Sequence, residues 1–124
     1  MNSVIRDACR EFTAGLHAHG SYMVEMADAK PRMEAREGGL VIVDIRPSAS
    51  YQLGHIPGSI NLPLADLVDG LSRLPLDRPL YIVCRLDAMS AYATALLRLL
   101  GYDAWLVQGG VPAWTEAGGK LEKG

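Results

Sequence analysis

The sequence contains only two cysteines in 124 residues, and Cys9 and Cys84 lie far apart in the chain. One bridge between them is possible, but two cysteines cannot build the disulfide framework of a small secreted domain. We therefore expect free thiols in a protein of the reducing cytoplasm. The sequence also lacks any run of about 18 apolar residues, so we expect no segment that spans a membrane.

The sequence also lacks a large excess of charge of either sign. The chain carries 12 Lys and Arg against 14 Asp and Glu, a net charge of −2, so we expect no basic surface for nucleic acid. The first 16 residues contain scattered charges and lack the apolar centre of a signal peptide. In contrast, 49% of the residues are apolar, which indicates a folded domain with a core of its own.

The periodicity of these apolar residues predicts alternating strands and helices. Apolar, β-branched runs of strand length occupy residues 21–26, 40–45, 60–62, 80–84 and 104–108. Helical patterns occupy residues 1–20, 28–39, 64–74, 90–101 and 111–118, with Pro31 in the first turn of the second and Ser90 near the cap of the fourth. Alternation of this kind predicts an α/β fold with a mostly parallel sheet.

Cys84 stands at the junction of a predicted buried strand and the helix that follows it. Sites in such sheets form at the carboxyl ends of strands. The helix N-terminus, the N–H groups of the loop and the neighbouring Arg85 all stabilise an anion, so they favour a reactive thiolate. A small buried side chain with no chemical role is the alternative, because free cysteines are often buried.

Three motifs, taken together, resemble the rhodanese family. The segment VIVDIRPSASYQLGHIPGSINLP contains Asp-x-Arg followed by Gly-His-Ile-Pro-Gly, YIVCRLDAMSA is similar to the family's active-site loop, and VQGGVPAW is similar to its closing signature. The resemblance covers residues 22–121 in the expected order. It implies a five-stranded, mostly parallel sheet flanked by helices in residues 21–124, with residues 1–20 as an extra N-terminal helix.

The resemblance also implies a sulfurtransferase. Cys84 would take a sulfane sulfur from a small-molecule or protein donor, thiosulfate or a persulfide, and pass it to cyanide or a thiol, with no metal or organic cofactor. Asp44 and Arg46 would support the site. The loop that binds the sulfur would consist of Arg85, Leu86, Asp87, Ala88, Met89 and Ser90.

The loop departs from the family pattern Cys-Arg-x-Gly-x-Arg-Ser at two positions. Asp87 replaces the glycine and Met89 replaces the second arginine. Together these changes remove one cation and add one anion, so we expect weak binding of the thiosulfate dianion and a better fit for a persulfide donor. From the sequence, the Asp87 side chain can point to solvent or pair with Arg85.

Two other functions fit parts of the same sequence. A rhodanese fold can serve as a binding or regulatory module with weak or no catalysis, although the presence of Cys84 counts against this. A cysteine phosphatase needs an arginine after Cys and five residues, and Ser90 stands there instead. His55 and the Asp44–Arg46 pair are expected to be structural, and the N-terminal helix either covers the sheet or presents its apolar stripe to a partner.

Overall fold

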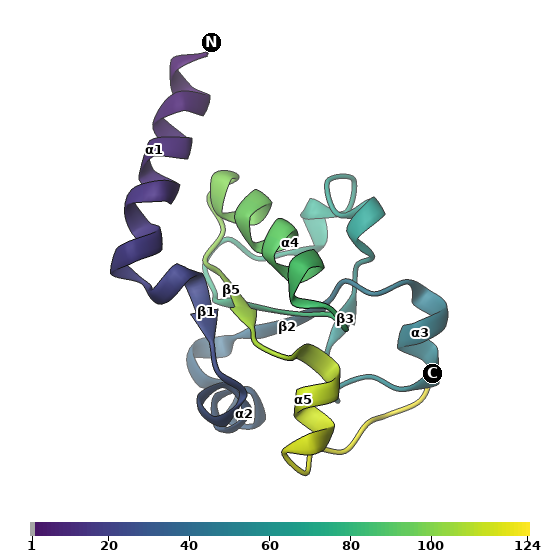
Figure 1. Cartoon of the computed structure of the whole chain (residues 1–124). Coiled ribbons are helices and arrows are strands. Elements are labelled where there is room, and N and C mark those ends of the chain that lie inside the picture. Colours follow the sequence, from purple (N-terminus) through teal and green to yellow (C-terminus); the bar gives the residue numbers. More distant parts are fainter. Residues whose placement is uncertain (1) are drawn as a thin grey trace.

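The computed structural model describes residues 2–124 and contains one five-stranded sheet (Figure 1). The strands are β1 (Met23–Val24), β2 (Val41–Asp44), β3 (Ile60–Asn61), β4 (Leu80–Val83) and β5 (Ala104–Val107). Their order in the sheet is β1-β5-β4-β2-β3, and all four neighbouring pairs are parallel. The predicted fold class is confirmed, and β4 is the central strand.

Helices cover both faces of the sheet. The α-helices are α1 (Ser3–Ala18), α2 (Met26–Ala35), α3 (Ser48–Leu53), α4 (Asp87–Leu99) and α5 (Gly110–Glu116). Short 3-10 turns occupy η1 (Gly20–Tyr22), η2 (Glu37–Gly39), η3 (Leu64–Asp66) and η4 (Leu71–Arg73). In Figure 1, α4 lies on one face of the sheet, and α2 and α5 lie on the other.

Alternate strand residues divide the core into two layers. Ile42, Tyr81 and Val83 belong to the layer that packs against α2 and α5. Val43, Leu80 and Ile82 belong to the layer that packs against α4. Each fully buried aliphatic side chain contributes about 1.5–3 kcal/mol by leaving water, so both layers stabilise the central strands that carry the loops above them.

The segment 64–74 is not the single helix that its apolar stripe predicts. It forms η3 and η4 with a turn between them. Leu67 and Leu74 are buried, whereas Val68 is 60% exposed. Two separate 3-10 turns can therefore bury leucines that are spaced as in a helix. The spacing of the apolar residues alone does not distinguish two such turns from one helix.

Two other helical expectations are corrected. Pro31 lies in the interior of α2, because the helix begins at Met26 and not near Asp28. Helix α3 is an addition to the predicted elements. Its sequence, SASYQL, has no apolar stripe, and in the structure none of its residues is buried.

The predicted N-terminal helix is present as α1, and it extends away from the body of the domain (Figure 1). The Asn2 side chain caps it by accepting a hydrogen bond from the N–H of Val4 at 2.8 Å. None of its residues is buried, and it lies beside α4 without covering the sheet. The first turn of its apolar stripe is exposed to solvent.

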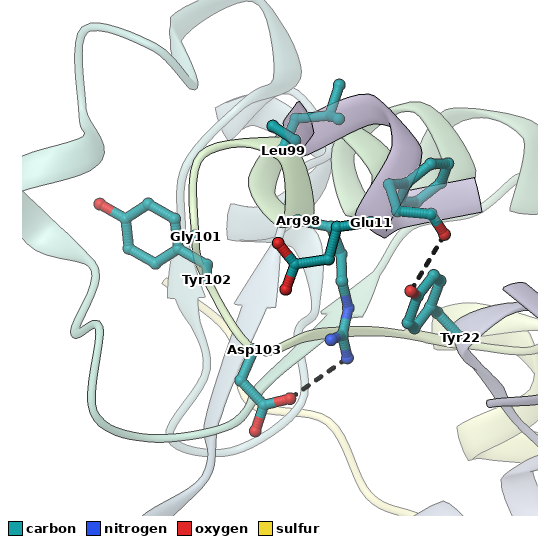
Figure 2. Close-up of a pocket in the computed structure, with 9 residues that line it drawn as sticks. Glu11, Tyr22, Arg98, Leu99, Gly101, Tyr102 and Asp103 are labelled. Carbon is teal, nitrogen blue, oxygen red and sulfur yellow. Dashed lines mark hydrogen bonds and ion pairs between the residues drawn. The ribbon is translucent and has the colours of Figure 1, made fainter. Parts of the chain in front are cut away.

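An aromatic cluster holds the second half of α1. The Tyr22 hydroxyl donates to the carbonyl of Phe12 at 3.1 Å, and the guanidinium of Arg98 lies 4.1 Å from the centre of the Tyr22 ring (Figure 2). Arg98 also pairs with Asp103 at 3.2 Å. Burial lowers the pKa of the Arg98 guanidinium, and the Asp103 carboxylate opposes that shift.

Between residues 2 and 124, no helix is long and apolar enough to cross a membrane.

Candidate active site

Cys84 directly follows the central strand β4, at its carboxyl end. The residue is only 7% exposed, and it borders two adjoining cavities of about 580 and 330 Å³. Both Cys84 and Cys9 are free thiols, and Cys9 is exposed on α1. The larger cavity therefore gives a small molecule a route to a thiol that is otherwise enclosed.

The loop after Cys84 is shorter than expected, because α4 begins at Asp87 and not near Ser90. The N–H groups of Met89 and Ser90 donate to the carbonyl of Leu86 at 3.1 and 3.4 Å. Within residues 2–124, the N–H groups of residues 85–88 have no such acceptor. The start of a helix has unpaired N–H groups of this kind, and they favour an anion nearby.

The segment Gly109–Val111, at the start of α5, clamps this loop from the side. The N–H of Val111 donates to the carbonyl of Cys84 at 3.0 Å. Gly110 has a φ of +53°, and a Cβ atom there would overlap the Cys84 carbonyl oxygen. A glycine is required at position 110 for two reasons, the backbone conformation and the close approach to Cys84.

The Asp87 side chain takes part in the same clamp. Its carboxylate accepts from the N–H of Gly109 at 2.9 and 3.2 Å. Neither of the two orientations considered from the sequence, toward solvent or toward Arg85, describes this bond. Asp87, one of the two residues that depart from the family pattern, thus ties the Cys84 loop to a residue 22 positions further along the chain.

We expect Asp87→Ala to lower the free energy of unfolding by about 1–2 kcal/mol, because it leaves the Gly109 N–H without its acceptor. Asp87→Asn keeps a side-chain oxygen in the same place and is expected to lose clearly less. Urea unfolding of the two variants beside the unmodified protein measures both values. Equal losses in the two variants would show that the bond to Gly109 is not what the carboxylate contributes.

Asp44 and Arg46 form a buried ion pair at the end of β2. Arg46 donates from Nη2 to Asp44 Oδ2 at 2.8 Å and from Nε to Oδ1 at 3.0 Å. The same Nη2 donates to the carbonyl of Gly54 at 2.7 Å, and the Asn61 amide donates to the carbonyls of Asp44 and Arg46. The pair thus joins β2 to the turn at Gly54, and Arg46 also lines the larger cavity.

The structure brings together only part of the predicted site. Cys84, Arg85, Leu86 and Met89 line the larger cavity, whereas Ala88 does not. Ser90 is fully buried on α4, and its hydroxyl has no hydrogen-bond partner among the described residues. Arg46 also lines this cavity, and it is the one lining residue outside the Cys84 loop that the sequence analysis proposed for the site. Six further residues complete the lining. The six are Pro47, Ser50, Val111, Pro112, Thr115 and Leu121.

A family model for the rhodanese-like domain matches residues 26–117, which include β2, the Cys84 loop and α5. The chain belongs to the rhodanese-like family. Its resemblance to that family is therefore confirmed. Helix α1 lies outside the matched residues.

Several relatives are similar along most of the chain. The thiosulfate sulfurtransferase GlpE of Shewanella oneidensis is 34% identical over 102 residues, which cover 82% of this chain and 93% of that protein. An HTH-type transcriptional regulator of Mycobacterium tuberculosis is 36% identical over 103 residues, also 82% of this chain. The match spans only 45% of that regulator's length.

A solved structure is similar in fold. The rhodanese-like domain of an Anabaena protein, determined by NMR in solution, has a TM-score of 0.74 and 32% sequence identity. The match covers 82% of this chain and 78% of that one.

Proposed function

We propose that this protein is a sulfurtransferase that carries sulfane sulfur on Cys84. The observation that carries the proposal is the position of the thiol. It lies at the end of the central strand, beside the unpaired N–H groups at the start of α4, and it borders an open cavity. Membership of the rhodanese-like family and similarity to a named thiosulfate sulfurtransferase support it.

The chemistry is a double displacement. The Cys84 thiolate attacks the outer sulfur of a donor such as thiosulfate, the S–S bond breaks, and sulfite leaves with the bonding electron pair. A thiol or cyanide acceptor then attacks the outer sulfur of the resulting persulfide, and the Cys84 thiolate leaves. In this scheme the unpaired N–H groups of residues 85–88 stabilise the anionic persulfide between the two steps.

Each partner of this reaction is a donor or an acceptor of sulfur. A small molecule or a protein supplies the sulfur, and a thiol or cyanide takes it. No metal or organic cofactor takes part in the scheme. The scheme requires Cys84 to stay reduced between turnovers, so we place the protein in the reducing cytoplasm.

Intact-protein mass spectrometry of the reduced, folded protein tests the proposal. The protein is incubated with thiosulfate and, separately, with glutathione persulfide. We expect the mass of one sulfur atom to be gained by the unmodified protein and by Cys9→Ser, and not by Cys84→Ser. Sulfur gained by Cys84→Ser but not by Cys9→Ser would assign the chemistry to the exposed thiol on α1 and refute the proposal.

A binding or regulatory module is the second candidate. It is favoured by the similarity of this chain to a segment of an HTH-type transcriptional regulator. If neither donor adds sulfur to the reduced, folded protein, this candidate replaces the first.

A further inference from the structure

We infer that the sulfur donor of this site is an organic persulfide with an apolar carbon group, and not inorganic thiosulfate. The inference rests on the proposed role of Cys84 and specifies its substrate class. Three features of the larger cavity lead to it: its apolar walls, its shortage of free cations, and a wall residue supplied by the C-terminal segment.

The cavity beside Cys84 is built for an organic group. Its volume of about 580 Å³ falls within the range of about 300–1,000 Å³ typical of pockets for organic ligands. The smaller cavity adjoins it through Pro47, Cys84 and Met89 and adds more apolar surface. Most of the wall of the larger cavity is apolar and consists of Pro47, Leu86, Met89, Val111, Pro112 and Leu121.

Cations in this cavity are too few for a dianion. Two arginines line it, but the guanidinium of Arg46 makes three contacts with the Asp44 carboxylate and a fourth with the Gly54 carbonyl. Arg85 is therefore the one lining cation in residues 2–124 without an ion-pair partner, and it is exposed to solvent. A desolvated dianion needs more compensation than one exposed cation and the unpaired N–H groups of residues 85–88 give, whereas a persulfide carries at most one charge at its reacting end.

The C-terminal segment holds Leu121 against the cavity. His55 and Glu122 exchange two backbone hydrogen bonds of 2.8 Å each, and the His55 ring is stacked on Tyr51 at 3.8 Å. In Figure 1 this segment runs back from α5 to end beside α3. Leu121 lies over Gly54, so that a side chain at position 54 would press against it. An apolar wall fixed by backbone pairing can select for the carbon group of a donor.

The step balances without an added oxidant or reductant. The Cys84 thiolate attacks the outer sulfur of R–S–SH, a new S–S bond forms on Cys84, and the old S–S bond breaks. The R–S⁻ group leaves with the electron pair and takes up a proton, so that Cys84–S–SH and R–SH are the products. In this arrangement the apolar group R packs against Met89 and Leu121 while the outer sulfur faces Cys84.

The test compares the rates at which donors load Cys84 in the full chain. Cys9→Ser serves as the background, so that Cys84 is the only thiol. Thiosulfate, glutathione persulfide and benzyl persulfide are each reacted and quenched, and the added sulfur is followed by intact mass. Every rate is divided by the rate of the same donor with free cysteine, which removes the donor's own reactivity. We expect benzyl persulfide to exceed thiosulfate by about tenfold or more.

Two variants test the walls of the cavity. Met89→Arg is expected to raise the thiosulfate rate and lower the benzyl persulfide rate, which changes their ratio by about tenfold. Leu121→Ala is expected to lower the benzyl persulfide rate several-fold and so to change the ratio of the two rates in favour of thiosulfate. Leu53→Ala is the matched control, since Leu53 is 79% exposed and does not line the cavity, and both rates should stay as they are.

The outcomes separate this inference from the proposed function. Loading of Cys84 that favours thiosulfate after normalisation, or an unchanged ratio in both Met89→Arg and Leu121→Ala, overturns the substrate class and leaves sulfur transfer in place. No loading from any of the three donors overturns the proposed function itself.

Discussion

Replacing Gly110 with alanine is expected to lower the free energy of unfolding by about 2–5 kcal/mol and to abolish the loading of Cys84 with sulfur. Gly110 has a φ of +53°, which an L side chain rarely adopts. In addition, the new Cβ atom would overlap the Cys84 carbonyl oxygen. Since that carbonyl also accepts from the Val111 N–H, relief requires movement of the Cys84 backbone itself.

Gly101→Ala separates the two causes. Gly101 also has a positive φ, +96°, but among residues 2–124, its two chain neighbours aside, no atom lies within 4 Å of the position of its Cβ atom. Its substitution is expected to cost only the conformational part, about 1–2 kcal/mol, and to leave the loading of Cys84 unchanged. Urea unfolding and donor loading are measured for both variants. If Gly110→Ala behaves like Gly101→Ala in both assays, the clamp on Cys84 has no functional importance.

The second large effect is expected for Arg46→Met, which should lower the free energy of unfolding by about 3–5 kcal/mol. Methionine matches much of the length of the arginine side chain but leaves the Asp44 carboxylate without its cation. That carboxylate is completely buried, and three of its contacts come from the Arg46 side chain. A buried charge that loses its partner is among the most destabilising changes in a core.

A double variant and a surface pair provide the controls for this experiment. Asp44→Val combined with Arg46→Met removes both charges and should be less destabilised than Arg46→Met alone. Arg10→Met disrupts the Asp7–Arg10 pair, whose side chains are about 70% exposed, and should change stability by less than about 0.5 kcal/mol. A double variant that is less stable than Arg46→Met would show that the pair contributes more than the cancellation of a buried charge.

The sequence predicted the parts of this fold that depend on local patterns. The apolar, β-branched runs became strands, and Cys84 lies at the end of one of them, as expected. The order of the three family motifs predicted the sheet correctly. Helix α1 lies within residues 1–20, as the apolar spacing predicts, because that spacing depends only on residues a few positions apart.

The details that the sequence did not predict depend on contacts between distant residues. Helix α4 begins at Asp87 and not near Ser90, and the Gly109 N–H that engages the Asp87 carboxylate lies 22 residues away. Leu121 is part of the cavity wall because the backbone of Glu122 pairs with His55. No periodicity in residues 118–124 indicates such a contact.

The clamp on the Cys84 loop has a consequence for synthesis on the ribosome. Cys84 emerges before the segment Gly109–Val111 that fixes its loop, and before β5, which pairs with β4 and with β1. Until those later residues are available, the Cys84 thiol of the nascent chain is exposed to solvent, and the edge of β4 that pairs with β5 has no partner strand. Ribosome-bound chains of increasing length should therefore lose reactivity toward a thiol probe at Cys84 only after the α5 segment has left the exit tunnel.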